Sequence, residues 1–331
     1  MLQLYELTAI LTKLGFCATF IVNLFFINLT LSHTKSIPST YKKLLVFFAV
    51  ICILFAGVDL TCQPFILNYN GGLVYFSLAE NESWSQELLR TVLWINASCY
   101  VSQLSCIAVQ FLFRYFTLIQ HRFAKSFHGK SQVIWLLYFL ATGALYGVLV
   151  LLFLEPDDYS DDYMAKEMQK VFKKDIKNTP RILAVAYENG KVRWKVLTYY
   201  CMGSCLMSCQ YLIIIFCSLK MRKAMKTELQ RFSTRNRKLE EQFFNALTIQ
   251  IILPTFLITL PIGFTLLVPL LDTEISCQTG VIFALYSLYP PLDSIATMVI
   301  VKEYRGCVRE LWKDLTCANR EEERYHERQR S

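Results

Sequence analysis

The sequence predicts an all-α membrane protein, a bundle of seven transmembrane helices with its N-terminus outside. The first observation is composition: 54% of the 331 residues are hydrophobic and only 18% are charged, whereas soluble domains keep charged residues near a quarter of the chain. The second is a series of apolar runs, nearly free of charge and long enough to cross a bilayer. The third is the gathering of Lys and Arg in alternate loops, which sets the orientation.

Seven apolar runs have the length of about 20 residues that a helix needs to cross a hydrocarbon core about 30 Å thick. They cover residues 14–31, 44–67, 91–113, 133–154, 196–219, 247–270 and 280–301. A transmembrane β-barrel would show alternating polarity along each strand, and these runs are apolar on all sides. The runs are therefore predicted to be helices.

Loop charges orient the bundle. The first, third and fifth loops are basic, and the fifth carries a cluster of Lys and Arg between residues 220 and 238, whereas the second and sixth loops carry mainly acidic residues. Basic loops stay in the cytoplasm, so the N-terminus is predicted outside and the tail inside. Of the sequons at Asn28, Asn81 and Asn96, only Asn81 falls in an outer loop, which makes it the expected glycosylation site.

Residues 1–315 form the predicted membrane domain, and residues 316–331 form a polar cytoplasmic tail. After the seventh run, apolar and charged side chains separate onto two faces, which predicts an amphipathic helix on the inner leaflet over about residues 302–315. Cys307 and Cys317 beside it are candidates for palmitoylation, although unmodified juxtamembrane cysteines are at least as common.

Asp59 and Asp293 are the charged residues inside the predicted spans. An intramembrane charge is costly and usually marks a function, but a role limited to hydrogen bonding between helices is given equal weight. An intramembrane aspartyl protease would need a Gly-x-Gly-Asp sequence, which neither aspartate has. The four histidines fall in predicted loops or the tail, so no metal site, cofactor or enzymatic activity is predicted.

Several motifs on these elements resemble the nematode Str-type serpentine chemoreceptors of the G-protein-coupled receptor superfamily. The stretch Phe113-Arg114-Tyr115-Phe116 at the inner end of the third span is similar to the arginine-tyrosine signature of seven-helix receptors. The stretches 242–254, Tyr289-Pro290-Pro291-Leu292-Asp293 and Lys302-Glu303-Tyr304-Arg305 look like the sixth and seventh helices of the Str family. The resemblance covers nearly the whole chain.

The resemblance implies a receptor in the plasma membrane of sensory cilia that detects a small environmental chemical and activates a heterotrimeric G protein. It makes Arg114 and Tyr115 the switch at the G-protein face, and Pro290, Asp293, Tyr304 and Arg305 the seventh-helix motif. Two features depart from the pattern of many seven-helix receptors. Phe113 replaces an acid beside the arginine, and the long outer loop has no cysteine for a disulfide to the third helix.

A pocket for a small apolar ligand is expected between the outer halves of spans three, five, six and seven, with the ligand entering from outside. Depth in the spans selects these candidates: Tyr100, Gln103, Tyr199, Tyr200, Phe264, Phe283 and Tyr286. Each is more often a packing residue than a ligand contact. The alternatives are an odorant-gated channel of inverted topology and a transporter. The basic charge is interpreted as topology rather than nucleic-acid binding, and a receptor dimer is left open.

Overall fold

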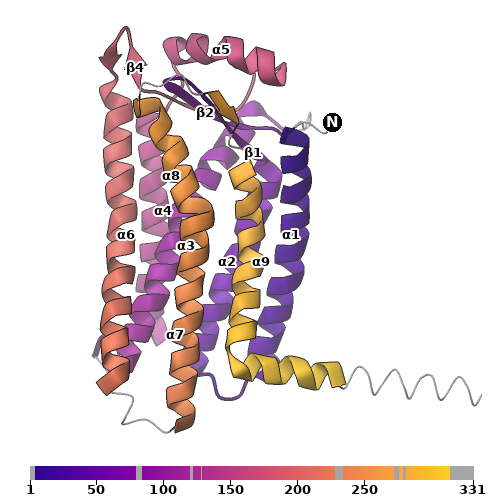
Figure 1. Cartoon of the computed structure of the whole chain (residues 1–331), viewed down its shortest axis with the longest axis vertical. Helices are drawn as coiled ribbons and strands as arrows, with labels where there is room; N and C mark the ends of the chain where they lie inside the picture. Colours follow the sequence, from indigo (N-terminus) through magenta and orange to yellow (C-terminus); the bar gives the residue numbers. More distant parts are fainter. Residues whose placement is uncertain are drawn as a thin grey trace, which may run out of the picture.

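The computed structural model describes residues 4–79, 84–119, 122–127, 129–227, 234–271, 276–278 and 281–313. Long helices stand side by side along the longest axis of the molecule (Figure 1). Those that form the bundle are α1 (Leu4–Asn28, continued by the π-helical turn η1, Leu29–His33), α2 (Ser39–Cys62), α3 (Gln86–Leu118), α4 (Gln132–Phe153), α6 (Trp194–Thr227), α7 (Thr234–Pro254), α8 (Leu260–Leu267) and α9 (Val281–Ile300). Short 3-10 turns, η2 (Arg122–Phe127) and η3 (Gly129–Ser131), precede α4.

Six segments of the described chain are long and apolar enough to cross a membrane, and α9, a further helix of 20 residues, packs along α1. The predicted all-α membrane fold is confirmed. The sixth span is a composite. Pro254 ends α7 because proline cannot donate to the helical ladder, and the chain continues through the π-helical turn η5 (Thr255–Thr259), α8 and the 3-10 turn η6 (Val268–Leu271).

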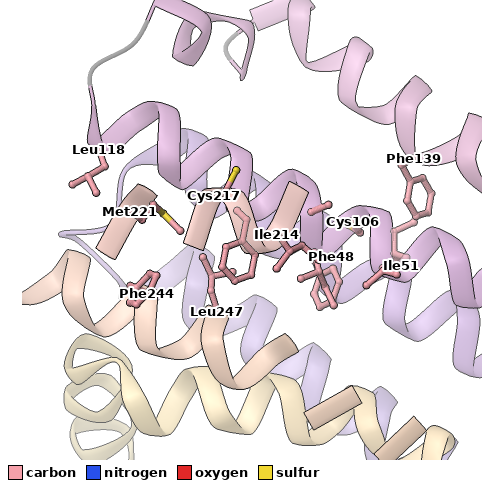
Figure 2. Packing of buried hydrophobic residues seen from close by; sticks show 14 of the residues in the cluster. Phe48, Ile51, Cys106, Leu118, Phe139, Ile214, Cys217, Met221, Phe244 and Leu247 are labelled. Carbon is pink, nitrogen blue, oxygen red and sulfur yellow. The ribbon is translucent and has the colours of Figure 1, made fainter. Parts of the chain in front are cut away.

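Apolar packing from five helices holds the inner half of the bundle together. Figure 2 shows Phe48 and Ile51, Cys106, Phe139, Ile214 and Leu247 converging from α2, α3, α4, α6 and α7. The outward faces are apolar as well, for example Leu152 at 64% exposed and Leu212 at 65%. An apolar surface of this extent is stable only when lipid covers it.

A sheet caps the end of the bundle that the loop charges place outside. It has the order β3-β2-β1-β6 and is formed by β1 (Pro64–Tyr69), β2 (Gly72–Ser77), β3 (Arg181–Val185) and β6 (Ser276–Gln278). Helix α5 (Asp158–Phe172) lies above it, and a short hairpin of β4 (Tyr187–Glu188) and β5 (Lys191–Val192) stands beside it (Figure 1). We refer to the four-stranded sheet and α5 together as the cap.

Both faces of the sheet carry apolar side chains, since the bundle helices cover one face and α5 covers the other. Ile66 of β1 pairs with Tyr75 of β2, which pairs in turn with Ile182 of β3, and this row packs with the outer ends of the bundle helices. Since side chains alternate between faces, the neighbouring positions, such as Phe65 and Phe76, point the other way and pack with Met164 and Met168 of α5. The cap is therefore two layers thick.

Ion pairs fix α5 to the rest of the cap. Arg181 of β3 donates from Nε and Nη2 to the two carboxylate oxygens of Asp161, both at 2.6 Å. Arg193, just before α6, contacts Asp157 and Ser160 at the start of α5. Partial burial acts to raise the pKa of Asp157, but hydrogen bonds from Ser160 and Arg193 outweigh it, and the pKa is lowered.

The cap changes two details of the sequence prediction. The second span was expected to reach residue 67, but the helix ends at Cys62 and the chain turns at Gln63, which has a left-handed φ of 43°. The following apolar residues belong to β1 instead. The long outer loop of mixed charge contains α5, β3 and the β4–β5 hairpin.

At the inner end, residues 302–313 form a helix that turns away from α9 (Figure 1). The Tyr304 hydroxyl lies 2.9 Å from that of Thr30. Glu303 accepts hydrogen bonds from the backbone N–H groups of Lys35 and Ser36, both at 2.6 Å. The helix expected over about residues 302–315 is thus present over the part of the chain that is described, and it is attached to the first inner loop.

Candidate functional site

A cavity of about 280 Å³ lies below the cap, between α3, α4, α6, α8 and α9. Its lining is mainly aliphatic and aromatic, and the residues that contribute hydroxyl groups are mostly tyrosines. Those tyrosines are Tyr75, Tyr100, Tyr146, Tyr199, Tyr200, Tyr211, Tyr286 and Tyr289. No Asp, Glu, Lys, Arg or His of the described chain lines it. A cavity of this size and chemistry suits a small uncharged molecule.

The structure places five of the seven expected pocket residues at this cavity: Tyr100, Gln103, Tyr199, Tyr200 and Tyr286. Phe264 is a correction, because it points away from the cavity and is 63% exposed on the lipid side of α8. Depth alone selected it, and depth does not fix the direction in which a helical side chain points; its neighbours Gly263 and Leu267 line the cavity. The side chain of Phe283 lies outside the described residues.

Some polar groups at the cavity are already paired and others are not. The Tyr286 hydroxyl donates to Oε1 of Gln103, and the hydroxyls of Tyr146 and Tyr199 lie 2.6 Å apart. Nε2 of Gln103 and the hydroxyl of Tyr200 have no hydrogen-bond partner among the described residues. Because a buried polar group without a partner is costly, these two atoms are the natural anchors for an oxygen atom of a ligand.

Asp59 lies beside the cavity at the centre of a polar network. It accepts from Asn96 Nδ2 of α3 at 3.3 Å and from the Ser287 hydroxyl of α9. Asn96 accepts in turn from the hydroxyl of Tyr75, a residue of β2 that also lines the cavity. The network therefore joins the cap, α2, α3 and α9 through four buried side chains.

Asp293 forms a second, separate network nearer the inner end. Gln250 of α7 donates to it at 3.0 Å and Tyr289 donates at 3.3 Å. Tyr289 also lines the cavity. Asp59 and Asp293 are each 1% exposed and have different hydrogen-bond partners.

Arg114 is buried near the inner end of α3. Its Nη1 donates to both carboxylate oxygens of Glu240 on α7, at 3.1 and 3.0 Å. The guanidinium lies 3.4 Å from the ring centroid of Tyr41 and 4.0 Å from that of Phe243, which adds cation–π attraction. Tyr115 faces α6 and packs edge-on against Phe216.

The carboxylate that holds Arg114 therefore comes from the sixth span rather than from the neighbouring position on α3. Phe113, which occupies that neighbouring position, stacks on Tyr41 with ring centroids 5.5 Å apart. The sequence prediction missed Glu240 because it is one of several charged residues at the start of α7. The signal that remained was its place one turn before the Gln242-Phe243-Phe244 stretch that carries the resemblance.

The arrangement of an arginine at the inner end of α3, a carboxylate on the sixth span and a tyrosine-rich cavity under the outer cap is that of a seven-helix receptor. The family model for the serpentine type 7TM GPCR chemoreceptor Str matches residues 8–309. The chain belongs to the Str family of serpentine chemoreceptors.

Curated relatives agree with the Str family assignment. The chain is 32% identical over 317 residues to the G-protein coupled receptor str-33 of Caenorhabditis elegans, covering 94% of this chain and 92% of the relative. It is 24% identical over 300 residues to serpentine receptor class r-10 of the same organism, covering 89% and 87%. The matches extend over nearly the whole length, so the family shared is that of the complete seven-helix domain.

The seventh-helix residues expected for a Str receptor are spread over two places. Pro290 and Asp293 lie within α9, whereas Tyr304 is fully buried and Arg305 is exposed in the helix of residues 302–313. Tyr304 stacks beside Phe26, with ring centroids 5.2 Å apart. Asp293 thus connects α9 to α7 through Gln250, and Tyr304 anchors the inner helix to α1.

The expected modification sites are only partly described. Cys307 is 8% exposed and its thiol donates to the His33 carbonyl at 3.4 Å, and burial, with Glu303 and Glu310 nearby, raises the pKa of the thiol. These features disfavour acylation in this conformation. Cys317 and Asn81 lie outside the described residues. The other two sequons, at Asn28 and Asn96, lie in α1 and α3.

Proposed function

We propose that the chain is a chemosensory receptor that binds a small uncharged molecule in the cavity below the cap and activates a heterotrimeric G protein at its inner end. The observation that carries this proposal is the pairing of Arg114 with Glu240 across α3 and α7, in a Str family chain whose outer half holds an uncharged cavity of about 280 Å³. One feature provides the switch and the other provides the ligand site.

The ligand is a compact, mainly apolar molecule with at least one oxygen. The aliphatic and aromatic lining excludes charge, because an ion would lose its hydration without gaining a countercharge. The Nε2 group of Gln103 and the Tyr200 hydroxyl, which have no partner among the described residues, provide hydrogen-bond donors for a carbonyl, ether or hydroxyl oxygen. Such a group contributes orientation and selectivity, while apolar contact contributes most of the affinity.

Activation is a shift between two arrangements of the sixth span. Tyr286 and Tyr289 line the cavity from α9, and Tyr289 and Asp293 contact Gln250 on α7. A ligand that binds more tightly when these contacts rearrange favours the arrangement in which the inner end of α7 separates from α3. Breaking the Arg114–Glu240 pair then exposes Arg114 to the G protein.

The polybasic inner loops support contact with the anionic leaflet and with the G protein. We propose that the receptor works in the plasma membrane of sensory cilia, and its membership of a chemoreceptor family supports this. The ligand and the G-protein subtype are the two partners that this function requires.

Nucleotide exchange tests this function. The receptor is reconstituted in vesicles with a heterotrimeric G protein and screened against volatile and water-soluble compounds. We expect an active oxygen-bearing compound to lose about tenfold in potency with Gln103→Leu or Tyr200→Phe, since one hydrogen bond to a ligand contributes about 1 kcal/mol or more. Phe264→Leu, on the lipid side of α8, is the matched control and should leave the potency unchanged. Equal potency in all variants would place the ligand elsewhere.

A further inference from the structure

The outer side of the cavity is closed by the cap. Ile66, Tyr75 and Ile182, the row of paired residues on the lower face of the sheet, all line the cavity and are 4%, 7% and 3% exposed. Above them lies the second layer, α5, packed on the opposite face. Within the described chain, therefore, the lining residues on the side of the aqueous exterior are shielded from solvent.

The lining is open at another place. Ser204 of α6 and Leu267 of α8 are the exposed residues among the described side chains that line the cavity, and Leu267 is 51% exposed. Gly263 and Met207, on the same two helices, also line it and are partly exposed. We call Ser204, Met207, Gly263 and Leu267 the mouth.

The mouth faces the hydrocarbon core and not water. At a rise of about 1.5 Å per residue, Ser204 and Gly263 lie about 10–12 Å inside the outer boundaries predicted for the fifth and sixth spans. Around them the outward faces of α6 and α8 are apolar, with Met202 46%, Leu260 55% and Phe264 63% exposed. Charged residues do not occur in α6 before Lys220 except Lys195 at its start, nor in α8.

Local sequence keeps the mouth open. A Cβ atom added to Gly263 would meet nothing within 4 Å, so the glycine leaves unfilled space between the two helices. On the inner side of the mouth, the Tyr211 hydroxyl of α6 bonds to Thr255 and Thr259 of η5, both at 3.0 Å. This polar bridge separates the mouth from a lower apolar groove of about 270 Å³ that also includes Tyr211.

From these observations we infer that ligands reach the cavity sideways, from the bilayer, through the mouth between α6 and α8. The inference rests on the proposed function, and it revises the expectation that ligand enters from outside. It also names the ligand class more closely: neutral molecules lipophilic enough to partition into the membrane before they bind. For such ligands, the concentration that determines binding is the concentration in the bilayer, and the closed cap does not block their entry.

Photolabelling measures this route without a known ligand. Purified receptor in phosphatidylcholine vesicles is mixed with a small apolar diazirine, flashed after a variable delay, and analysed by mass spectrometry. The label on Tyr100 and Tyr286, which line the cavity away from the mouth, is followed as a function of the delay. The double variant Ser204→Trp/Leu267→Trp covers the mouth. Met202→Trp/Leu260→Trp, on the lipid faces of the same helices, is the matched control.

We expect wild type and control to label these tyrosines at the same rate, and the mouth variant to be slower by about tenfold, which corresponds to about 1.4 kcal/mol on the barrier to entry. The amount of label on lipid-facing Phe256 should be equal in wild type, the control and the mouth variant, and it reports correct folding and insertion. If Phe256 of the double variant is labelled differently, Ser204→Trp and Leu267→Trp are measured as single variants. Equal rates in all variants, or no label on Tyr100 and Tyr286 in wild type at any delay, would overturn lateral entry. Neither result would bear on the proposal of G-protein activation, because nucleotide exchange tests that proposal independently.

Discussion

Arg114 and Glu240 join the inner ends of α3 and α7 through a single guanidinium nitrogen that donates to both carboxylate oxygens, at 3.1 and 3.0 Å. The arginine side chain is 4% exposed and the glutamate 22%. Because α3 and the sixth span also enclose the cavity, we expect a ligand that moves these helices to change the contact between Arg114 and Glu240 at the cytoplasmic side.

Replacing Glu240 with Gln should raise basal signalling. The change leaves the buried Arg114 without its countercharge, which costs the closed arrangement about 1–2 kcal/mol and shifts the equilibrium by about five- to thirtyfold toward the open one. Basal nucleotide exchange without added ligand measures the effect. Glu241→Gln is the control, because Glu241 is 46% exposed and pairs only locally with Arg237. Equal basal exchange in both variants would remove the pair from the switch.

Tyr75→Phe should loosen the connection between the cap and the bundle. The substitution keeps the aromatic ring at the cavity but removes the hydroxyl that donates to Asn96, leaving a buried amide oxygen with one partner fewer. We expect a loss of about 1–2 kcal/mol in the free energy of unfolding, seen as a lower melting temperature in detergent. Tyr69→Phe, at the end of strand β1 in the same sheet, should change it by much less. A reversed order would show that the Asp59 network does not support the cap.

The sequence was sufficient for the spans because each one is a long apolar run with at most one charged residue, and a chain that crosses lipid in such a run has to form a helix. It was not sufficient for the cap. Residues 64–67 are apolar like the second run before them, and periodicity cannot separate a buried strand from a helix end; Gln63-Pro64 is the local sequence signal that the helix ends. Strand pairing between β2 and β3 joins residues about a hundred positions apart, which no local pattern encodes.

The candidate site also has parts that the sequence predicts and parts that it does not. Arg114 was found from a local motif, whereas its partner Glu240 is brought to it only by packing of α7 against α3. Five of the expected pocket residues lie at the cavity and Phe264 does not, because depth gives the height of a side chain and not its direction. The closed cap and the open mouth depend on many side chains at once, so neither was predicted.

Acid should release the N-terminal end of α5. The pKa of Asp157 is lowered in the folded protein despite partial burial, because Ser160 and Arg193 bond its carboxylate. The stability it contributes is therefore complete above its unfolded pKa of about 3.9 and is lost as the pH falls through the lower folded value. Hydrogen exchange of α5, compared at pH 7 and pH 3 after correction for the intrinsic rate, measures it. Asp157→Asn should show the faster exchange already at pH 7.

Topology gives an independent check on the orientation. An N-terminal epitope should be accessible in unpermeabilised cells, and Asn81→Gln should abolish the shift in mobility that a glycosidase produces in wild type, because the acidic loops are expected outside. An epitope exposed only after permeabilisation, together with an unmodified Asn81, would invert the bundle and favour the odorant-gated channel.

The most direct test of receptor function is ligand-dependent nucleotide exchange on a heterotrimeric G protein by purified receptor in vesicles, with membrane current recorded in parallel. The account predicts a neutral, lipophilic compound that accelerates exchange in wild type, is less potent with Tyr200→Phe, and evokes no current when the G protein is absent. A compound that evokes current without G protein, and leaves exchange unchanged, would contradict it.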